Sequence, residues 1–229
     1  MEQLERNKAI LGKYIPENAV ATIANWIFTY DFKLKIKRAR STKYGDYRPP
    51  VKGLNHQITI NQDLNKYAFL NTLVHEIAHL SAWQKYGNNI QSHGKEWKSE
   101  YRLLLQPFLH DKIFPEDVIS ALRDYIHNPA ATVCSDKKLF KTLRKYDENS
   151  DGRIFLDELP LQSHFIAEDT HTYLKIKKIR TRYLCSRVNT RHEYLFHGTA
   201  QVTPLRKEDS IMQSSKENRF LAGIAQLIS

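Results

Sequence analysis

The sequence predicts an α+β protein, with a helix-rich domain that contains a small sheet, followed by a small antiparallel β-module. Residues 66–86 contain neither proline nor glycine, and their apolar side chains recur at helical spacing. Upstream, Phe32, Leu34 and Ile36 alternate with lysines, as in a strand with one buried face. Beyond residue 130, short runs rich in β-branched and aromatic residues are separated by polar turns, which is typical of antiparallel strands.

The elements of the first domain have ends that are marked by capping or breaking residues. Pro16 separates two N-terminal helices, and Asn65 and Gly87 suit the cap and the stop of the central helix. Asn128 and Pro129 close the domain. The predicted helices cover residues 3–14, 17–29, 66–86, 96–105 and 116–127, and the predicted strands cover residues 31–44 and 55–61.

The distal part begins with a short basic helix over residues 137–146 and continues with six short strands between residues 153 and 203. After residue 206 the chain becomes polar and then ends in an apolar decapeptide. We therefore expect a first domain over residues 1–129, a β-module over residues 130–206, and a flexible C-terminal tail over residues 207–229 that carries a short terminal helix.

Composition narrows the class of protein. The chain has 229 residues, of which 41% are hydrophobic, and this is enough to build a core. The charged N-terminus argues against a signal peptide, and no stretch reaches the roughly 20 apolar residues of a membrane span. Two distant cysteines fit a reducing compartment, so we expect a cytoplasmic protein. We also expect a monomer. The net charge of +10 suits a polyanionic partner.

The most informative segment is V-H-E-I-A-H-L, residues 74–80, which contains the pattern H-E-x-x-H. On a helix, His75 and His79 lie one above the other on the same face, so that both imidazoles can bind one metal ion. Glu76 follows the first histidine and can reach a water molecule at that ion. Zn²⁺ suits this site, because it accepts imidazole nitrogens and keeps a position open for water.

A catalytic zinc ion needs a third protein ligand, and His93 is the leading candidate. It precedes Gly94 in the segment Q-S-H-G-K-E-W-K, and residues 87–92 form a loop that could bring it back to the helix. The alternative is an ordinary helix whose two histidines are satisfied by neighbouring groups. The clear amphipathic helix and the third histidine on a nearby turn favour the metal site.

With these motifs the chain resembles the SprT-like family of zincin metalloproteases, which includes bacterial SprT and the eukaryotic Spartan proteases. The resemblance rests on T-L-V-H-E-I-A-H-L at residues 72–80 and H-G-K-E-W-K at residues 93–98, where Trp97 is the aromatic residue that follows the third histidine. It is strong over residues 32–108. It implies a zincin-like domain, zinc ligands at His75, His79 and His93, a catalytic base at Glu76, and a protein substrate.

The chain departs from that family in its distal part. Better-known SprT proteins carry a zinc ribbon with paired C-x-x-C motifs, whereas Cys134 and Cys185 are the two cysteines of this chain and lie far apart. No four-cysteine site can form within the chain, so both cysteines are expected to be small buried hydrophobic residues. The resemblance therefore predicts a ribbon-like β-module without metal.

Residues 147–158 read D-E-N-S-D-G-R-I-F-L-D-E and match the calcium loop of an EF-hand. Pro160 lies where the exiting helix should continue, and Phe155 occupies a position that is usually polar. The alternative is a helix, a polar Asp-Gly turn and a strand. A calcium-regulated protease is a third hypothesis.

Two basic segments suggest contacts with DNA or another nucleic acid. One alternates lysine with apolar residues along a strand, and the other places cations and tyrosines together on the β-module. The alternative is a solvated cationic sheet face with Tyr173, Tyr183 and Tyr194 in the core. The candidate contacts are Lys33, Lys35, Lys37, Lys175, Lys177, Lys178, Arg180 and Arg182.

Two hypotheses for function follow. The first is a zinc-dependent endopeptidase, which the resemblance to Spartan would direct at DNA-associated proteins. The second is a nucleic-acid-binding or transcription-associated accessory protein with a structural or idle zinc site. The presence of Glu76 favours the enzyme, because an idle site has no need of a base beside the metal.

Overall fold

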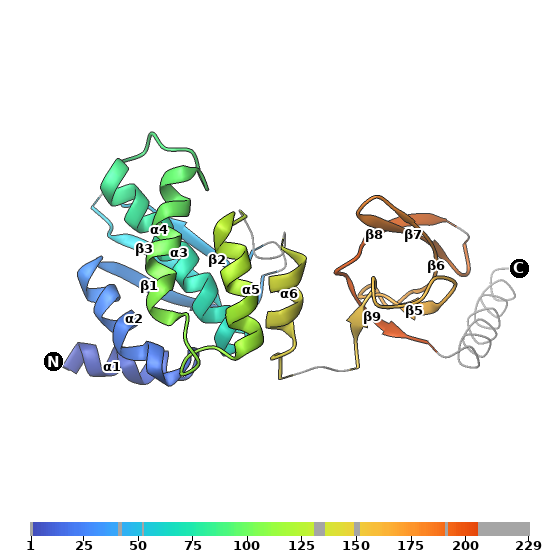
Figure 1. The fold of residues 1–229 in the computed structure, drawn as a ribbon, viewed down its shortest axis with the longest axis horizontal. Coiled ribbons are helices and arrows are strands. Elements are labelled where there is room, and N and C mark those ends of the chain that lie inside the picture. Colours follow the sequence, from blue (N-terminus) through green and yellow to red (C-terminus); the bar gives the residue numbers. More distant parts are fainter. Residues whose placement is uncertain are drawn as a thin grey trace, which may run out of the picture. The chain divides into compact units, whose positions relative to one another are not determined.

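The computed structural model describes residues 2–40, 43–51, 53–130, 136–148, 152–190 and 192–205. It divides the chain into two compact units, Met1–Glu148 and Asn149–Ser229 (Figure 1). The mixture of helices and two small sheets confirms the predicted α+β class. No helix in the described ranges is long and apolar enough to cross a bilayer.

The first unit combines helices with one three-stranded sheet. The central helix was predicted with its observed bounds, whereas the predicted strand over residues 31–44 ends at Lys37. The strand Gly45–Arg48 was not predicted, because G-D-Y-R shows no run of β-branched residues. The elements are α1 (Glu2–Leu11), α2 (Glu17–Thr29), β1 (Phe32–Lys37), β2 (Gly45–Arg48), β3 (His56–Asn61), α3 (Lys66–Tyr86), α4 (Lys95–Leu105), η1 (Gln106–Phe108), α5 (Glu116–His127) and α6 (Lys137–Arg144).

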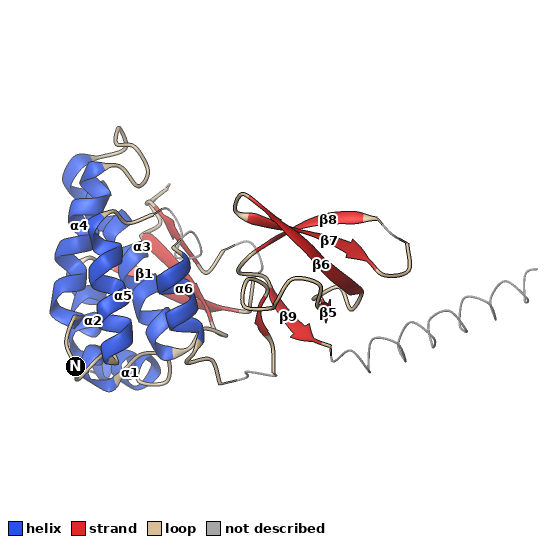
Figure 2. Ribbon diagram, turned by 45° about the vertical axis from the view of Figure 1, so that its right-hand side comes forward, coloured by secondary structure: helices blue, strands red, loops and turns tan. Residues whose placement is uncertain are grey.

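The sheet has the strand order β1-β3-β2, so β1 and β2 are its two edges. Strand β1 runs parallel to β3, and β2 runs antiparallel to it. The register pairs Leu34 with Ile58 and Ile36 with Ile60, which places these apolar residues on one face. Helices cover that face, as Figure 2 shows, whereas the lysines of β1 lie on the opposite face.

Helix α3 runs through the core of this unit. Asn65 caps it by accepting hydrogen bonds from the backbone N–H groups of Tyr67 and Ala68, at 3.1 and 3.0 Å. Gly87 ends it with a φ of 75°, a conformation that favours glycine. The helix is buried on almost every side between residues 68 and 82, which is why its apolar stripe is so wide.

The first unit extends beyond the predicted domain end at residue 129. Helix α6 packs Leu139 and Leu143 into the same core as the preceding helices. The side chain of Asn65 donates hydrogen bonds to the Leu143 carbonyl at 2.9 Å and to the Asp147 carboxylate at 2.7 Å. These contacts tie the segment up to residue 148 to the start of α3, so the compact unit ends at Glu148.

The second unit is an antiparallel β-module with its own core. That core contains Phe165, Tyr173 and Cys185, and Cys185 is a buried free thiol. Cys134 and the tail after Leu205, for which a flexible segment was predicted, lie outside the described residues. The strands, in the spatial order β4-β9-β5-β6-β7-β8, are β4 (Ile154–Phe155), β5 (His164–Ile166), β6 (Thr172–Ile179), β7 (Arg182–Arg187), β8 (Glu193–His197) and β9 (Gln201–Pro204).

Candidate metal centre

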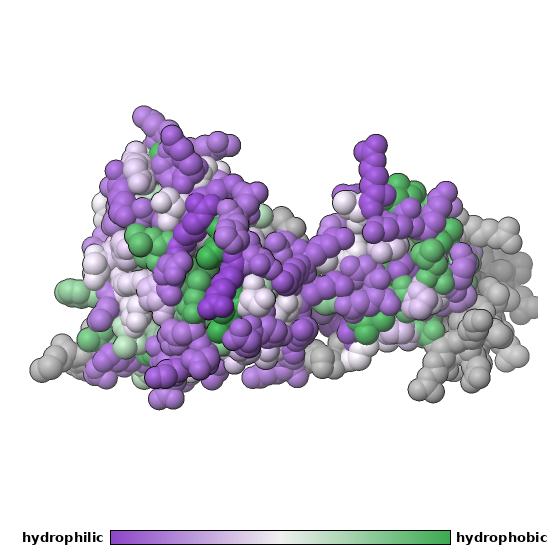
Figure 3. Space-filling model, viewed as in Figure 1, coloured by the Kyte–Doolittle hydropathy of each residue, from purple (hydrophilic) through white to green (hydrophobic). Residues whose placement is uncertain are grey.

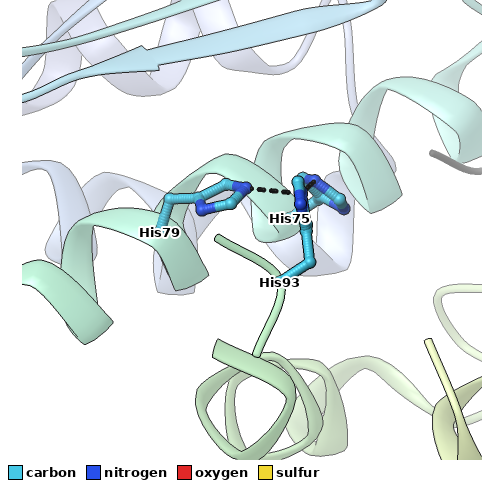
Figure 4. A group of neighbouring side chains, drawn as sticks. All are labelled: His75, His79 and His93. Carbon is cyan, nitrogen blue, oxygen red and sulfur yellow. Dashed lines mark hydrogen bonds between the residues drawn. The ribbon is translucent and has the colours of Figure 1, made fainter. Parts of the chain in front are cut away.

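Three histidine side chains converge in the first unit. His75 and His79 project from successive turns of α3, and His93 reaches them from the loop before α4 (Figure 4). The Nε2 atom of His93 lies 3.2 Å from Nε2 of His75 and 2.9 Å from Nε2 of His79. Nitrogens bound to one tetrahedral zinc ion lie roughly 3.3 Å apart. The spacing therefore fits one metal ion held by three imidazoles.

The loop before α4 is shaped to present His93. His93 has a φ of 59°, in the left-handed region, and Gly94, the N-cap residue of α4, follows it. A Cβ atom on Gly94 would lie 2.9 Å from the Gln91 carbonyl oxygen, so the turn requires glycine. The Ser92 hydroxyl lies 3.1 Å from Nδ1 of His93. This contact leaves Nε2 directed at the other two histidines.

Trp97 forms the wall against which the three imidazoles rest. Its ring centroid lies 4.6 Å from that of His75, 5.3 Å from that of His79 and 4.7 Å from that of His93. The indole is fully buried, and its Nε1 atom donates a hydrogen bond to the His75 carbonyl at 3.3 Å. One rigid ring therefore fixes the orientation of all three candidate ligands.

The protonation states of the histidines suit metal binding. Burial lowers the pKa of His75 well below its usual value, and the neighbouring histidines lower it further. Burial, and then His93, lower the pKa of His79 to about 3, and burial also lowers the pKa of His93. The imidazoles are therefore neutral near pH 7, and neutral imidazole is the form that binds a metal ion.

Glu76 lies beside this cluster under the edge strand β2. Burial raises the pKa of its carboxyl to about 8, Asp46 contributes to the rise, and a backbone hydrogen bond from Tyr47 opposes it. A Cβ atom on Gly45 would lie 2.5 Å from Oε1 of Glu76. Glycine at position 45 thus lets β2 lie directly on α3 at the carboxyl, a contact that the sequence analysis missed.

Strand β2 also contributes Tyr47, which the sequence analysis did not select. The Tyr47 ring lies parallel to that of His79, with centroids 6.4 Å apart. Its hydroxyl is 2.9 Å from Nδ1 of His56, which anchors the ring beside the histidine cluster. Aromatic side chains therefore support the cluster on two sides, Trp97 from α4 and Tyr47 from β2.

The comparison with family models matches a segment of the first unit. Residues 18–108 match the model described as the SprT-like family. We call the first unit the SprT-like domain after this matching segment. The matched segment runs from α2 to η1 and contains Glu76 and all three histidines of the cluster. No curated protein and no solved structure matches the chain.

The predicted nucleic-acid contacts fall into different environments. Lys33 and Lys37 are exposed on the open face of the SprT-like domain's sheet, and Lys35 is half-buried there. In the β-module, the exposed cations surround the turn between β6 and β7 and are Lys177, Lys178, Arg180 and Arg182. Tyr173 and Tyr183 are buried in the core, as the alternative reading expected, and Tyr194 is 39% exposed.

Lys175 is not available to a phosphate, because it is buried and only 2% exposed. Its Nζ atom donates hydrogen bonds to the carbonyls of Leu156, at 2.6 Å, and Leu159. It also lies 3.9 Å from the centroid of the Tyr183 ring. Burial lowers the pKa of this lysine. The prediction that Lys175 contacts nucleic acid is therefore wrong. Lys175 connects β6 to the turn that follows β4.

The candidate calcium loop is only partly described, because residues 149–151 lie outside the described ranges. The Asp147 carboxylate pairs with Arg144 at 2.8 Å and accepts a hydrogen bond from Asn65. After the short strand Ile154–Phe155, residues 156–162 form turns and no helix, where an EF-hand would have its second helix. These features agree with the alternative of a helix, a turn and a strand.

Proposed function

We propose that the SprT-like domain is a zinc-dependent endopeptidase. The observation that carries the proposal is the convergence of three neutral imidazole nitrogens next to a buried carboxyl group. Three nitrogen ligands leave a fourth position open, which is the arrangement of catalytic zinc sites. His75, His79 and His93 would hold the ion. When bound, a zinc ion supplies the Lewis acidity that polarises a peptide carbonyl.

Glu76 would move the proton. Its carboxylate would accept a proton from the attacking water and pass it to the nitrogen of the leaving amine as the peptide bond breaks. Burial raises the pKa of this carboxyl to about 8, so the group can gain and lose a proton close to neutral pH. A structural metal site would not need such a group, which supports the enzyme over an accessory protein with an idle site.

The open edge of β2 would bind the substrate. The Asn61 N–H donates to the Tyr44 carbonyl at 2.9 Å, so the alternation of the ladder turns Asp46 and Arg48 toward β3. The backbone groups of Gly45 and Tyr47 are then directed away from the sheet, beside Glu76. An extended polypeptide that pairs with this edge would place a peptide bond next to the cluster.

Association with nucleic acid is a further part of the proposal. The four exposed cations at the β6–β7 turn support electrostatic contact with a phosphate backbone, which would direct the enzyme to DNA-associated proteins. Binding of this kind weakens steeply as salt rises. Replacing Lys177, Lys178 and Arg180 by alanine should reduce the salt dependence by roughly two to three units, and a wild-type salt slope near zero would reject the contact.

The test uses the full chain. We expect metal analysis to find one zinc ion per chain. We also expect cleavage of casein or histone, which is measured with and without single-stranded DNA. Glu76→Gln should retain zinc and lose about 100-fold or more of the cleavage rate, because the amide keeps the shape and cannot accept the proton. His93→Ala should lose both zinc and cleavage.

Two matched controls test whether these losses are specific. His110→Ala and Glu168→Gln alter exposed residues outside the cluster and should change neither zinc content nor rate. If Glu76→Gln cleaved within a few-fold of the wild type, the endopeptidase mechanism would be rejected. Zinc binding without any cleavage would favour the accessory protein.

A further inference from the structure

An apolar groove lies in the SprT-like domain, away from the histidine cluster. It has a volume of about 990 Å³ and is lined by residues of α1, α2 and β1. Phe28 and Ile10, both on its walls, are 85% and 44% exposed. On the face shown in Figure 3, hydrophobic residues reach the surface of this unit between hydrophilic ones. A phenylalanine this exposed contributes little to the fold and suits a binding surface.

The groove runs along an unpaired strand edge. Strand β1 is the last strand of the sheet, so one side of it has no neighbouring strand. The Lys37 carbonyl accepts a hydrogen bond from the Gln62 N–H at 2.8 Å, which shows that Lys37 directs its backbone toward β3. Because the direction alternates, the backbone groups of Leu34 and Ile36 are directed to the open edge.

The side chains of β1 alternate in the same way. Leu34 and Ile36 line the groove, which continues over α1 and α2 beyond the edge of the sheet. By the same alternation Lys33, Lys35 and Lys37 belong to the opposite face, although Lys33 also forms part of the groove wall. A strand added beside β1 would therefore place every second side chain over the groove and the others next to three lysines.

We propose that the β1 edge and this groove bind an extended segment of another protein in which apolar and acidic residues alternate. Apolar side chains would enter the groove at Phe28, and carboxylates would face the three lysines. Lysine on an edge strand discourages pairing with neutral or basic strands, so the same residues give selectivity for an acidic one. A phosphate backbone would account for the lysines and not for the groove.

The site lies at the edge opposite to β2 and the histidine cluster, and its occupation does not depend on the proposed peptidase activity. A partner held there would be docked without entering the cleavage site. If the partner is also a substrate, its docked segment and its cleaved segment would be different parts of its chain.

The test measures binding of a capped nine-residue peptide in which valine or isoleucine alternates with glutamate. We expect binding to the full chain, at least tenfold stronger than that of a scrambled peptide of equal composition. Phe28→Asp should weaken binding at least tenfold and leave the fold intact, because the residue is exposed. Lys33→Glu with Lys37→Glu should abolish binding of this peptide and create binding of its lysine analogue.

Two further controls separate a strand edge from a sticky or merely basic surface. Lys13→Glu with Lys112→Glu changes the charge equally at exposed sites elsewhere and should leave binding unchanged. Two further peptides carry methyl groups on the backbone nitrogens of every second residue, one at the odd positions and one at the even positions. One of the two should lose binding and the other should keep it, because only alternate residues of an added strand donate to β1. Equal binding of the scrambled peptide, or no loss with either methylated peptide, would overturn the proposal. So would binding of an oligonucleotide alone, lost with the two lysines and unaffected by Phe28→Asp.

Discussion

In the SprT-like domain, one buried and two half-buried neutral imidazoles direct their nitrogens at one another, whereas in the β-module a buried ammonium group is directed at two carbonyls. The first arrangement gathers electron-pair donors around one point and calls for a cation from outside the chain. In the second arrangement the chain itself provides the cation, on Lys175. The first lies beside the large core of the SprT-like domain and the second beside the small core of the β-module, and both bring together residues from different elements.

The histidine cluster is arranged to bind a ligand, whereas the Lys175 contacts hold the β-module together. Without a metal ion, the converging nitrogens of the histidine cluster can only share the protons of their own imidazoles, and one metal ion could replace those protons. The ammonium of Lys175 and the carbonyls of Leu156 and Leu159 satisfy one another. The absence of metal from the β-module stays a prediction from the cysteine count, and Lys175 is the cation that connects β6 to the turn after β4.

Removal of zinc should have the largest effect on stability and should act on one unit alone. If zinc is present at about a thousand times its Kd, its binding stabilises the SprT-like domain by about 4 kcal/mol, which a chelator removes. Calorimetry should show the melting transition of this domain fall while that of the β-module stays in place. Equal shifts of both transitions would break the distinction between the two centres.

Replacement of the buried ammonium is the converse experiment. Lys175→Met keeps most of the side-chain volume and leaves the Leu156 and Leu159 carbonyls without their donor. We expect the β-module to lose about 3 kcal/mol of unfolding free energy, while zinc content stays unchanged. Lys177→Met, at an exposed position two residues along the same strand, is the matched control and should cost little.

Cys185 gives a local measure of this loss. Burial raises the pKa of its thiol to about 11, so almost no thiolate forms at pH 8 in the folded module. In a Cys134→Ser background, a thiol reagent should label Cys185 faster in Lys175→Met than in the parent protein. Unchanged labelling would show that the ammonium is not needed to hold the module closed.

Adding a single methyl group at Gly45, which contacts Glu76, should lower activity, whereas the same change at a glycine with free space around it should not. Gly45→Ala would place Cβ within 2.5 Å of Glu76 Oε1, so β2 or the carboxyl must move. We expect cleavage to fall about 100-fold with zinc retained, because displacement of a catalytic group by about 1 Å is that costly. Gly12→Ala, whose Cβ would meet only the Lys8 carbonyl at 3.5 Å, should be tolerated. Similar rates for both variants would reject the close contact as a catalytic requirement.

The sequence predicted the helical part of the metal centre better than the rest, for a geometric reason. The spacing of His75 and His79 fixes their shared face on any helix, and Gly94 marked the turn at His93. Strand β2 escaped notice because it is short and is defined by its contact with α3. Lys175 is buried because it alternates in phase with the buried Tyr173 and pairs with the buried Cys185, whereas Lys177 follows an irregularity in the register of β6 and β7 and is exposed.

The smallest expected effect concerns the residue that orients His93. The Ser92 hydroxyl lies 3.1 Å from Nδ1, on the side of the ring opposite to the cluster. Ser92→Ala removes that partner and leaves the three ligands in place. We expect zinc affinity to fall about tenfold, at the lower end of the effects seen when such supporting groups are removed, because Ser92 is exposed and water can replace part of its role. Competition with a chromophoric chelator measures this change.

Ser186→Ala, in the β-module, is the control and should leave zinc affinity unchanged. If Ser92→Ala lost as much zinc affinity as His93→Ala, Ser92 would hold the loop itself and not only the tautomer of His93.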